Sequence, residues 1–206
     1  MFISLDGVDG VGKSTQLAAL ADWLRESGRE VVTCRDPGST ELGEAVRRLL
    51  LATGGAPICR TSEMLLYMAS RAQLVEQVIR PALDAGKTVL ADRYLLANVV
   101  YQGHAGGLDV DTLWEIGRVA TGGLRPTLTV VLDMPPEAAA RRLERSLDRM
   151  ESQGDDFRER LRRGFLDEAA RRADEIVVID AARSIDTVQT DIRAAVKQVV
   201  QRHQAT

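Results

Sequence analysis

The residues with the clearest chemistry lie near the start of the chain, where positions 7–14 read GVDGVGKS. This segment matches the phosphate-binding pattern G-x-x-x-x-G-K-[ST]. Its glycines let backbone N–H groups converge on phosphate oxygens, and Lys13 adds a mobile charge for the β- and γ-phosphates of a nucleotide. The hydroxyl of Ser14 is suited to binding Mg²⁺. We expect ATP or a similar nucleotide to contact Gly7, Val8, Asp9, Gly10, Val11, Gly12, Lys13, Ser14 and Thr15.

A second candidate pair, Asp92 and Arg93, directly follows the apolar run TVLA. The carboxylate of Asp92 could hold Mg²⁺ through water, and the guanidinium of Arg93 could clamp the phosphates of a donor and an acceptor. The same pair is also typical of a structural salt bridge. The phosphate-binding pattern elsewhere in the chain favours the functional interpretation.

These residues need a sheet edge to hold them together. Short apolar runs that resemble buried strands occupy residues 2–5, 31–34, 88–91, 128–132 and 176–179. Longer segments of helical period lie between or after them, at residues 16–27, 41–51 and 185–200. This alternation predicts an α/β fold, a parallel sheet with helices on both faces. Ligands of such sheets bind at the carboxyl ends of the strands, where both candidate groups begin.

Composition limits the class of protein. The chain has 206 residues, of which 45% are hydrophobic, so we expect one folded domain spanning residues 1–206. A net charge of −3 argues against binding polymeric nucleic acid. Cys34 and Cys59 are too few for a disulfide framework. We identify neither a signal peptide nor a membrane span, and therefore expect a cytoplasmic protein that does not bind membranes.

A phosphate-binding loop alone does not separate kinases from GTPase switches, motors or binding modules. The chain contains no N-K-x-D sequence of the kind that reads guanine, and 206 residues leave little room for a motor. A kinase acting on a small acceptor is the leading interpretation. A non-catalytic nucleotide-binding module is the alternative from another class.

Residues 139–163 are dense in charge and nearly free of large apolar side chains. From charge alone this segment is typical of a solvated helix face. Its arginines at positions 141, 145 and 149 are four residues apart, so they would share one face of a helix, with Arg142 beside that face. Several of these guanidiniums could reach a bound phosphate together.

Several sequence blocks together resemble the thymidylate kinases. They are GVDGVGKST, RDPGST, YMASRAQ, DRYLLANVVYQG, GGLRPTLTVVLD and an Arg-rich segment with DRME, in that order from residue 2 to about 166. The resemblance implies a P-loop NTPase fold with a five-stranded parallel sheet and a mobile Arg-rich lid at about residues 141–154. It also implies a homodimer that uses ATP and Mg²⁺ to phosphorylate dTMP.

The resemblance also assigns the acceptor site. Arg71 would hydrogen-bond the thymine ring, Tyr67 would lie near it, and Asn98 and Gln102 would complete the base and phosphate contacts. Fixed donors and an aromatic face suit a buried base. A single Tyr or Asn on a helix is also typical of packing, and only the joint register of these residues favours the site.

The sugar and phosphate of the acceptor have their own expected partners. The resemblance places Asp9 near the 3′-hydroxyl and phosphate, and Asp36 to Gly38, including Pro37, in the acceptor loop, with Arg93 on the phosphate. Tyr101 would crowd the 2′ position and so disfavour a ribonucleotide.

The expected catalysis requires charge neutralisation and no general base, because the phosphate nucleophile is already ionised at neutral pH. Bacterial relatives that carry Gly after the acidic P-loop residue, as Gly10 follows Asp9 here, usually supply an arginine from the lid. Arg145 and Arg149 are the preferred lid candidates, to act with Lys13 and Arg93.

Three positions depart from the family pattern. Ser39 stands where a second Gly is usual, Ala97 replaces a small hydroxyl residue, and Val100 replaces Ala. All three lie near the expected acceptor pocket, so another monophosphate or a deoxynucleoside stays open as the acceptor. His104 has no assigned role.

Overall fold

A single parallel sheet organises the chain. The structure, a computed structural model, describes the backbone of residues 1–52, 57–142 and 154–204. Five strands pair in the order β2-β3-β1-β4-β5, every neighbouring pair being parallel. They are β1 (Phe2–Asp6), β2 (Val31–Arg35), β3 (Thr88–Asp92), β4 (Leu128–Asp133) and β5 (Ile176–Asp180). The predicted fold class is confirmed.

Each strand ends one residue beyond its predicted apolar run. The extra residue is charged in every case: Asp6, Arg35, Asp92, Asp133 and Asp180. A ladder hydrogen bond uses backbone groups only, so a polar side chain does not end the strand. The sheet consequently delivers five charged residues to its carboxyl edge.

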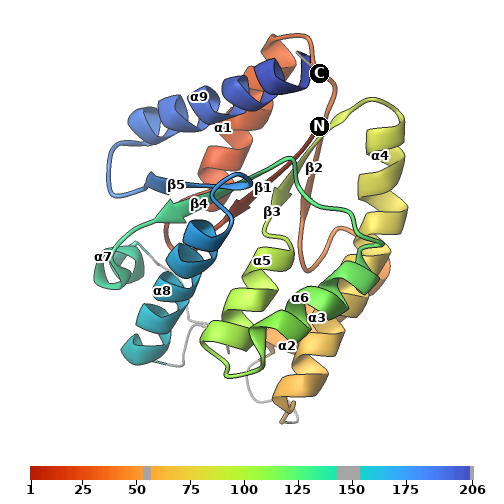
Figure 1. The fold of residues 1–206 in the computed structure, drawn as a ribbon, viewed down its shortest axis with the longest axis vertical. Helices are drawn as coiled ribbons and strands as arrows, with labels where there is room; N and C mark the ends of the chain where they lie inside the picture. Colours follow the sequence, from red (N-terminus) through yellow and green to blue (C-terminus); the bar gives the residue numbers. More distant parts are fainter. Residues whose placement is uncertain (53–56, 143–153, 205–206) are drawn as a thin grey trace.

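Helices cover both faces of the sheet (Figure 1). Those of the described residues are α1 (Lys13–Glu26), α2 (Glu41–Leu51), α3 (Arg60–Leu74), η1 (Val75–Ile79), α4 (Arg80–Asp84), α5 (Leu95–Asn98), η2 (Val99–His104), α6 (Val110–Ala120), α7 (Pro136–Arg141), α8 (Asp155–Arg171) and α9 (Ile185–Gln204). Helices α1 and α9 lie side by side on one face, and α3, α5, α6 and α8 lie on the other. None of the helices in the described ranges is long and apolar enough to cross a membrane.

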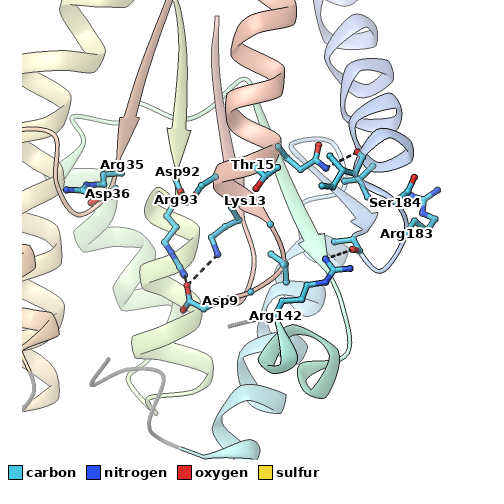
Figure 2. Close-up of a pocket in the computed structure, with 18 of the residues that line it drawn as sticks. Asp9, Lys13, Thr15, Arg35, Asp36, Asp92, Arg93, Arg142, Arg183 and Ser184 are labelled. Atoms are coloured by element: carbon cyan, nitrogen blue, oxygen red, sulfur yellow. Dashed lines mark hydrogen bonds and ion pairs between the residues drawn. The ribbon is translucent and has the colours of Figure 1, made fainter. Parts of the chain in front are cut away.

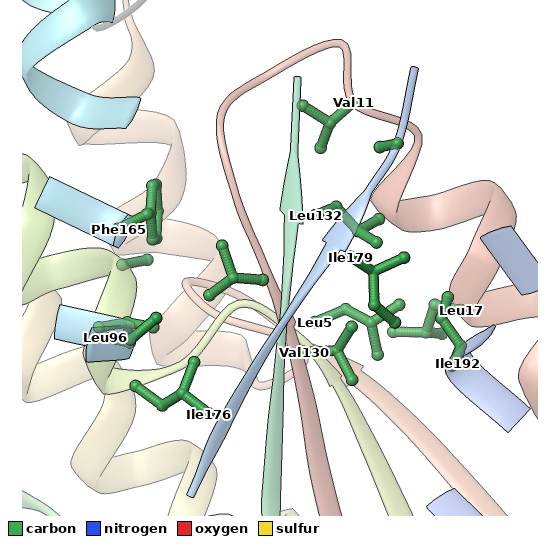
Figure 3. Close-up of a cluster of buried hydrophobic side chains, with 14 of the residues drawn as sticks. Leu5, Val11, Leu17, Leu96, Val130, Leu132, Phe165, Ile176, Ile179 and Ile192 are labelled. Atoms are coloured by element: carbon green, nitrogen blue, oxygen red, sulfur yellow. The ribbon is translucent and has the colours of Figure 1, made fainter. Parts of the chain in front are cut away.

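Buried apolar side chains pack on both faces of the sheet, between the strands and the covering helices. Leu17 of α1 and Ile192 of α9 pack on one side of the strands, and Leu96 of α5 and Phe165 of α8 pack on the other (Figure 3). These four side chains are at most 9% exposed. The core fixes the sheet rigidly beneath the loops that follow the strands.

The helix after β3 changes its winding at η2, which is π-helical. The N–H of Ala105 bonds to the carbonyl of Val100, five residues earlier, at 3.0 Å. Single π-helical turns recur at functional sites, because they redirect side chains that a regular helix would stack. Asn98, Tyr101 and Gln102, the predicted acceptor residues, lie at or within this segment.

His104, unassigned from the sequence, contacts a buried carboxylate on α8. Its Nε2 lies 2.9 Å from Oε1 of Glu168, and Nε1 of Trp114 donates to Oε2 of Glu168 at 3.0 Å. Arg172 adds an ion pair at 3.4 Å, and its guanidinium carbon lies 4.0 Å from the centroid of the Trp114 ring. Glu168 is fully buried and thus joins η2, α6 and α8.

We expect Glu168→Ala to lower the free energy of unfolding by about 3 kcal/mol, because its partners would lose a shared buried acceptor. Urea denaturation followed by circular dichroism measures this change. Asp167→Ala removes an exposed carboxylate from the same helix and should change stability by less than about 0.5 kcal/mol. Equal effects of the two substitutions would contradict the bridging role of Glu168.

Candidate active site

The phosphate-binding loop joins β1 to α1 in the conformation that its glycines permit. Gly7, Gly10 and Gly12 have φ values of 132°, 88° and 92°, which side chains with a Cβ rarely adopt. A Cβ on Gly10 would also overlap the carbonyl oxygen of Ala139. The loop therefore presents bare backbone at the amino end of α1, the end of a helix that favours anions.

Lys13, the first residue of α1, points back over the loop. Its Nζ donates to the carbonyl oxygens of Gly7 at 3.1 Å and Val8 at 2.8 Å, and lies 3.7 Å from Oδ1 of Asp9. The side chain is only 6% exposed. The ammonium group is thus held next to the phosphate cradle.

Arg93 and Asp9 form a charged pair beside Lys13 (Figure 2), and Tyr101 contacts both of them. An N–H of Arg93 donates to Oδ1 of Asp9 at 2.5 Å, and the Tyr101 hydroxyl donates to Oδ2 at 3.0 Å. The Arg93 guanidinium carbon lies 5.0 Å from the Tyr101 ring centroid. Burial would raise the pKa of Asp9, but the charges of Arg93 and Lys13 outweigh it and hold that pKa well below its usual range.

The backbone of Arg93 is strained. Its φ is 68°, a left-handed value that costs energy for a residue with a Cβ. Its N–H donates to the carbonyl of Leu5 at 2.9 Å, which holds it against the sheet. Such outliers cluster at functional sites, because only a rigid surrounding structure maintains them.

Ser14 and Asp92 have the donor atoms that Mg²⁺ prefers. The Ser14 hydroxyl donates to Oδ2 of Asp92 at 2.8 Å, so oxygens from the P-loop helix and from β3 meet. Mg²⁺ usually takes one or two such protein ligands and completes its shell with phosphates and water. The pair fits that ion.

Asp6, the last residue of β1, is a fully buried carboxylate. Neither carboxylate oxygen has a hydrogen-bond partner among the residues that the structure describes. Burial raises the pKa of Asp6 to about 6, although the Arg93 charge opposes the shift. No sequence motif assigns a role to Asp6.

A cavity of about 770 Å³ opens above the P-loop. Predicted nucleotide residues 9–15 line it, whereas Gly7 and Val8 do not and instead supply carbonyls to Lys13. Its far end is lined by Arg142, Ala181, Arg183, Ser184 and Ile185. The Arg142 guanidinium donates to the carbonyl of Ala181 at 3.2 Å.

A smaller cavity of about 90 Å³ adjoins the first. Nine residues predicted to bind the acceptor line it, whereas Gly38 of the predicted acceptor loop does not: Asp9, Asp36, Pro37, Tyr67, Arg71, Arg93, Asn98, Tyr101 and Gln102. Their individual roles stay predictions. Arg47 of α2, which the sequence analysis missed, lines both cavities and donates to the carbonyl of Pro37 at 3.2 Å. In the sequence, Arg47 is marked only as a cation beside Val46, in the apolar stripe of an amphipathic helix.

Arg71 is the most buried cation of the smaller cavity, at 1% exposure. Its Nε donates to Oδ2 of Asp36 at 2.5 Å, and one terminal N–H donates to Oδ1 of Asn98 at 3.0 Å. Burial raises the pKa of Asp36, and the Arg71 charge opposes that shift. The pair fixes the guanidinium at the floor of the cavity.

Arg145 and Arg149, the preferred lid arginines, lie outside the described residues, as do positions 143–153 of the predicted lid. Of the neighbouring arginines that are described, Arg162 is paired with Asp133 through bonds of 2.8 and 2.9 Å.

The chain is similar to proteins of one family. The sequence profile described as "Thymidylate kinase" matches residues 5–192. A thymidylate kinase from Rhodopirellula baltica is 47% identical over 192 residues, which are 93% of this chain and 78% of that protein. One from Symbiobacterium thermophilum is 45% identical over 203 residues, covering 98% and 95% of the two chains. The crystal structure of thymidylate kinase from Ehrlichia chaffeensis matches with a TM-score of 0.78 at 28% identity, covering 95% of this chain and 98% of that one.

Proposed function

This chain belongs to the thymidylate kinase family, and from that premise we propose which of its residues transfer the γ-phosphoryl group of ATP to dTMP, giving dTDP and ADP. The enzyme is an ATP-dependent nucleoside monophosphate kinase. The observation that supports the assignment is that the two adjoining cavities share Asp9, Asp36, Arg47 and Arg93. A nucleotide-binding module needs only the larger cavity.

The larger cavity is the ATP site in this proposal. Backbone N–H groups of the P-loop and the ammonium of Lys13 bind the phosphates, while Arg142 and Arg183 lie at the end that would receive the base. Mg²⁺, when bound by Ser14 and through water by Asp92, neutralises phosphate charge.

The smaller cavity is the dTMP site. The Arg71 guanidinium and the Asn98 amide offer fixed polar groups to the base edge, and the Tyr67 ring offers an aromatic face. The Tyr101 ring, held by Asp9 through its hydroxyl, would crowd a 2′-hydroxyl in this proposal, as the family resemblance implies. Arg47, which lines both cavities, would add a positive charge for the acceptor phosphate.

Transfer itself consists of holding two polyanions together. The nucleophile is an ionised phosphate oxygen, so no side chain has to remove a proton. Arg93 lies in the wall common to both cavities, where its guanidinium can contact the attacking and the transferred phosphates.

We expect Arg149→Ala to lower kcat about 100-fold and to change the KM for dTMP much less, because a lid arginine would meet charge that develops in the transition state. Steady-state kinetics give both constants. Arg145→Ala is the companion variant, since the two positions lie one helical turn apart in the sequence. A raised KM with unchanged kcat would assign Arg149 to ground-state binding.

The proposal is tested by a coupled assay of ADP release with Mg-ATP and each nucleoside monophosphate in turn. Turnover with dTMP above dUMP, UMP and the purine monophosphates supports both cavity assignments. Turnover with a different monophosphate or a deoxynucleoside keeps the kinase and overturns the thymine site. ATP binding without any turnover favours a binding module.

We also propose that the chain acts as one P-loop kinase domain over residues 1–206, as a homodimer and in the cytoplasm. One sheet uses strands from Phe2 to Asp180, which supports the single domain. The dimer rests on family resemblance, and analytical ultracentrifugation of the purified chain tests it.

A further inference from the structure

A line of buried hydrogen bonds leads from the dTMP cavity to a residue behind it. Arg71 donates to Oδ1 of Asn98 at 3.0 Å, and Nδ2 of Asn98 donates to Oε1 of Gln102 at 2.7 Å. Nε2 of Gln102 then donates to Oε1 of Glu63 at 2.8 Å. Glu63, on α3, is 7% exposed and does not line the cavity as the structure describes it.

The residues at the two ends of this series of hydrogen bonds determine which groups along it donate and which accept. A guanidinium can only donate hydrogen bonds, and a carboxylate can only accept them. The amides of Asn98 and Gln102 can each do either, depending on which way they are turned. Only one orientation of each amide satisfies all three bonds. Turning Gln102 over would set its carbonyl oxygen against the carboxylate of Glu63, two acceptors facing in a buried place.

We propose that Glu63 is a specificity-determining positioning residue, which holds the Asn98 amide, through Gln102, in the orientation that presents an oxygen to the acceptor base. The inference deepens the proposed function and rests on the dTMP site. Asn98 Oδ1 keeps one lone pair beyond the bond from Arg71. The Arg71 guanidinium has five N–H groups, and one remains beyond those that donate to Asp36, Met68, Asn98 and the carbonyl of Tyr94.

The chemistry of the bases makes this orientation selective. Thymine and uracil present an N3–H donor beside the O4 acceptor, whereas cytosine presents an N3 acceptor beside an amino donor. An Asn98 oxygen next to the Arg71 donors therefore matches thymine and uracil and opposes cytosine. Because Glu63, together with Arg71, fixes the orientation of the Asn98 amide, it affects which base binds without touching that base.

The test is Glu63→Gln, which keeps the size of the side chain but lets it donate or accept. Calorimetry measures the dissociation constants of dTMP, dUMP and dCMP. We expect the preference for dTMP over dCMP to fall about tenfold, roughly the effect of one buried hydrogen bond to a charged group. The preference for dTMP over dUMP should not change, since those bases differ only by a methyl group away from the hydrogen-bonding edge.

Two further variants separate this role from a structural one. Glu41→Gln removes a first-turn carboxylate from the neighbouring helix α2, where it is exposed, and should leave both preferences unchanged. The double variant Glu63→Gln with Gln102→Glu moves the obligatory acceptor one step along the line, so Asn98 can keep its orientation. We expect it to regain most of the preference against dCMP.

The outcomes are distinct. If Glu63→Gln weakens all three monophosphates equally, Glu63 only supports packing and the inference is overturned. If the single variant does not fold, loss of the preference against dCMP in a folded double variant overturns it instead. Failure of the wild-type protein to phosphorylate dTMP would refute the proposed function, which the same preparation tests separately.

Discussion

Replacing Lys13 with alanine is expected to lower kcat for dTMP phosphorylation about 10³-fold, while leaving the fold intact. The ammonium group lies in the P-loop with hydrogen bonds of 3.1 and 2.8 Å to the carbonyls of Gly7 and Val8. Burial and the Arg93 charge lower the pKa of Lys13, whereas Asp9 opposes this shift. The protein thus holds two cations close together, an arrangement that an incoming polyphosphate would stabilise.

Steady-state kinetics with Mg-ATP measure this effect, and thermal unfolding checks the fold. Lys87→Ala is the matched control, because it removes the same charge from an exposed ion pair with Glu30. Lys87 directly precedes β3, so it lies at the amino end of that strand, and the site lies at the carboxyl end. We expect near-normal kcat in the control. Near-normal turnover in Lys13→Ala would remove the P-loop lysine from the mechanism.

The fold and the P-loop were predictable because they depend on local patterns. Apolar runs bounded by charged residues determine where buried strands lie, and the P-loop pattern encodes a backbone conformation through glycine. The strands ended one residue late only because ladder bonds ignore side-chain polarity. The acceptor residues were found through the family resemblance and would not have been identified from helical period alone.

Other features depend on contacts between distant segments, which no local pattern records. Glu63 and Gln102 are 39 residues apart in the chain, and their side-chain hydrogen bond joins α3 to η2. The left-handed backbone of Arg93 and the buried carboxylate of Asp6 likewise depend on neighbouring strands. In the sequence, Arg47 is typical of any cation on a helix surface. Its role in the site depends on the fold, which brings α2 next to Pro37.

Ser39, which stands where the family usually has glycine, also has a conformation and a contact that no local sequence pattern records. Its φ is 62°, a value that explains why glycine is usual there. The serine has a compensating contact, because its hydroxyl accepts from the N–H of Arg35 at 2.9 Å. The loop next to Pro37 therefore keeps its conformation with a side chain that the sequence alone marked as a departure.

Arg93→Ala is expected to lower kcat about 10³-fold as well, through a different interaction. Arg93 lines both cavities, and its guanidinium is oriented by Asp9 at 2.5 Å and by the face of Tyr101. A fixed guanidinium between two phosphates stabilises charge that moves from one to the other. Its loss should therefore reduce kcat far more than it raises the KM for dTMP.

The conservative variant distinguishes geometry from charge. Arg93→Lys keeps the positive charge but cannot form two parallel hydrogen bonds, so we expect about 10²-fold loss of kcat, between the wild type and Arg93→Ala. Arg125→Ala, which removes an exposed arginine paired with Glu175, is the control and should be near normal. Full activity in Arg93→Lys would mean that Arg93 acts as a point charge and that its strained, fixed orientation is not needed for transfer. A raised KM with unchanged kcat in Arg93→Ala would place the residue in ground-state binding of dTMP.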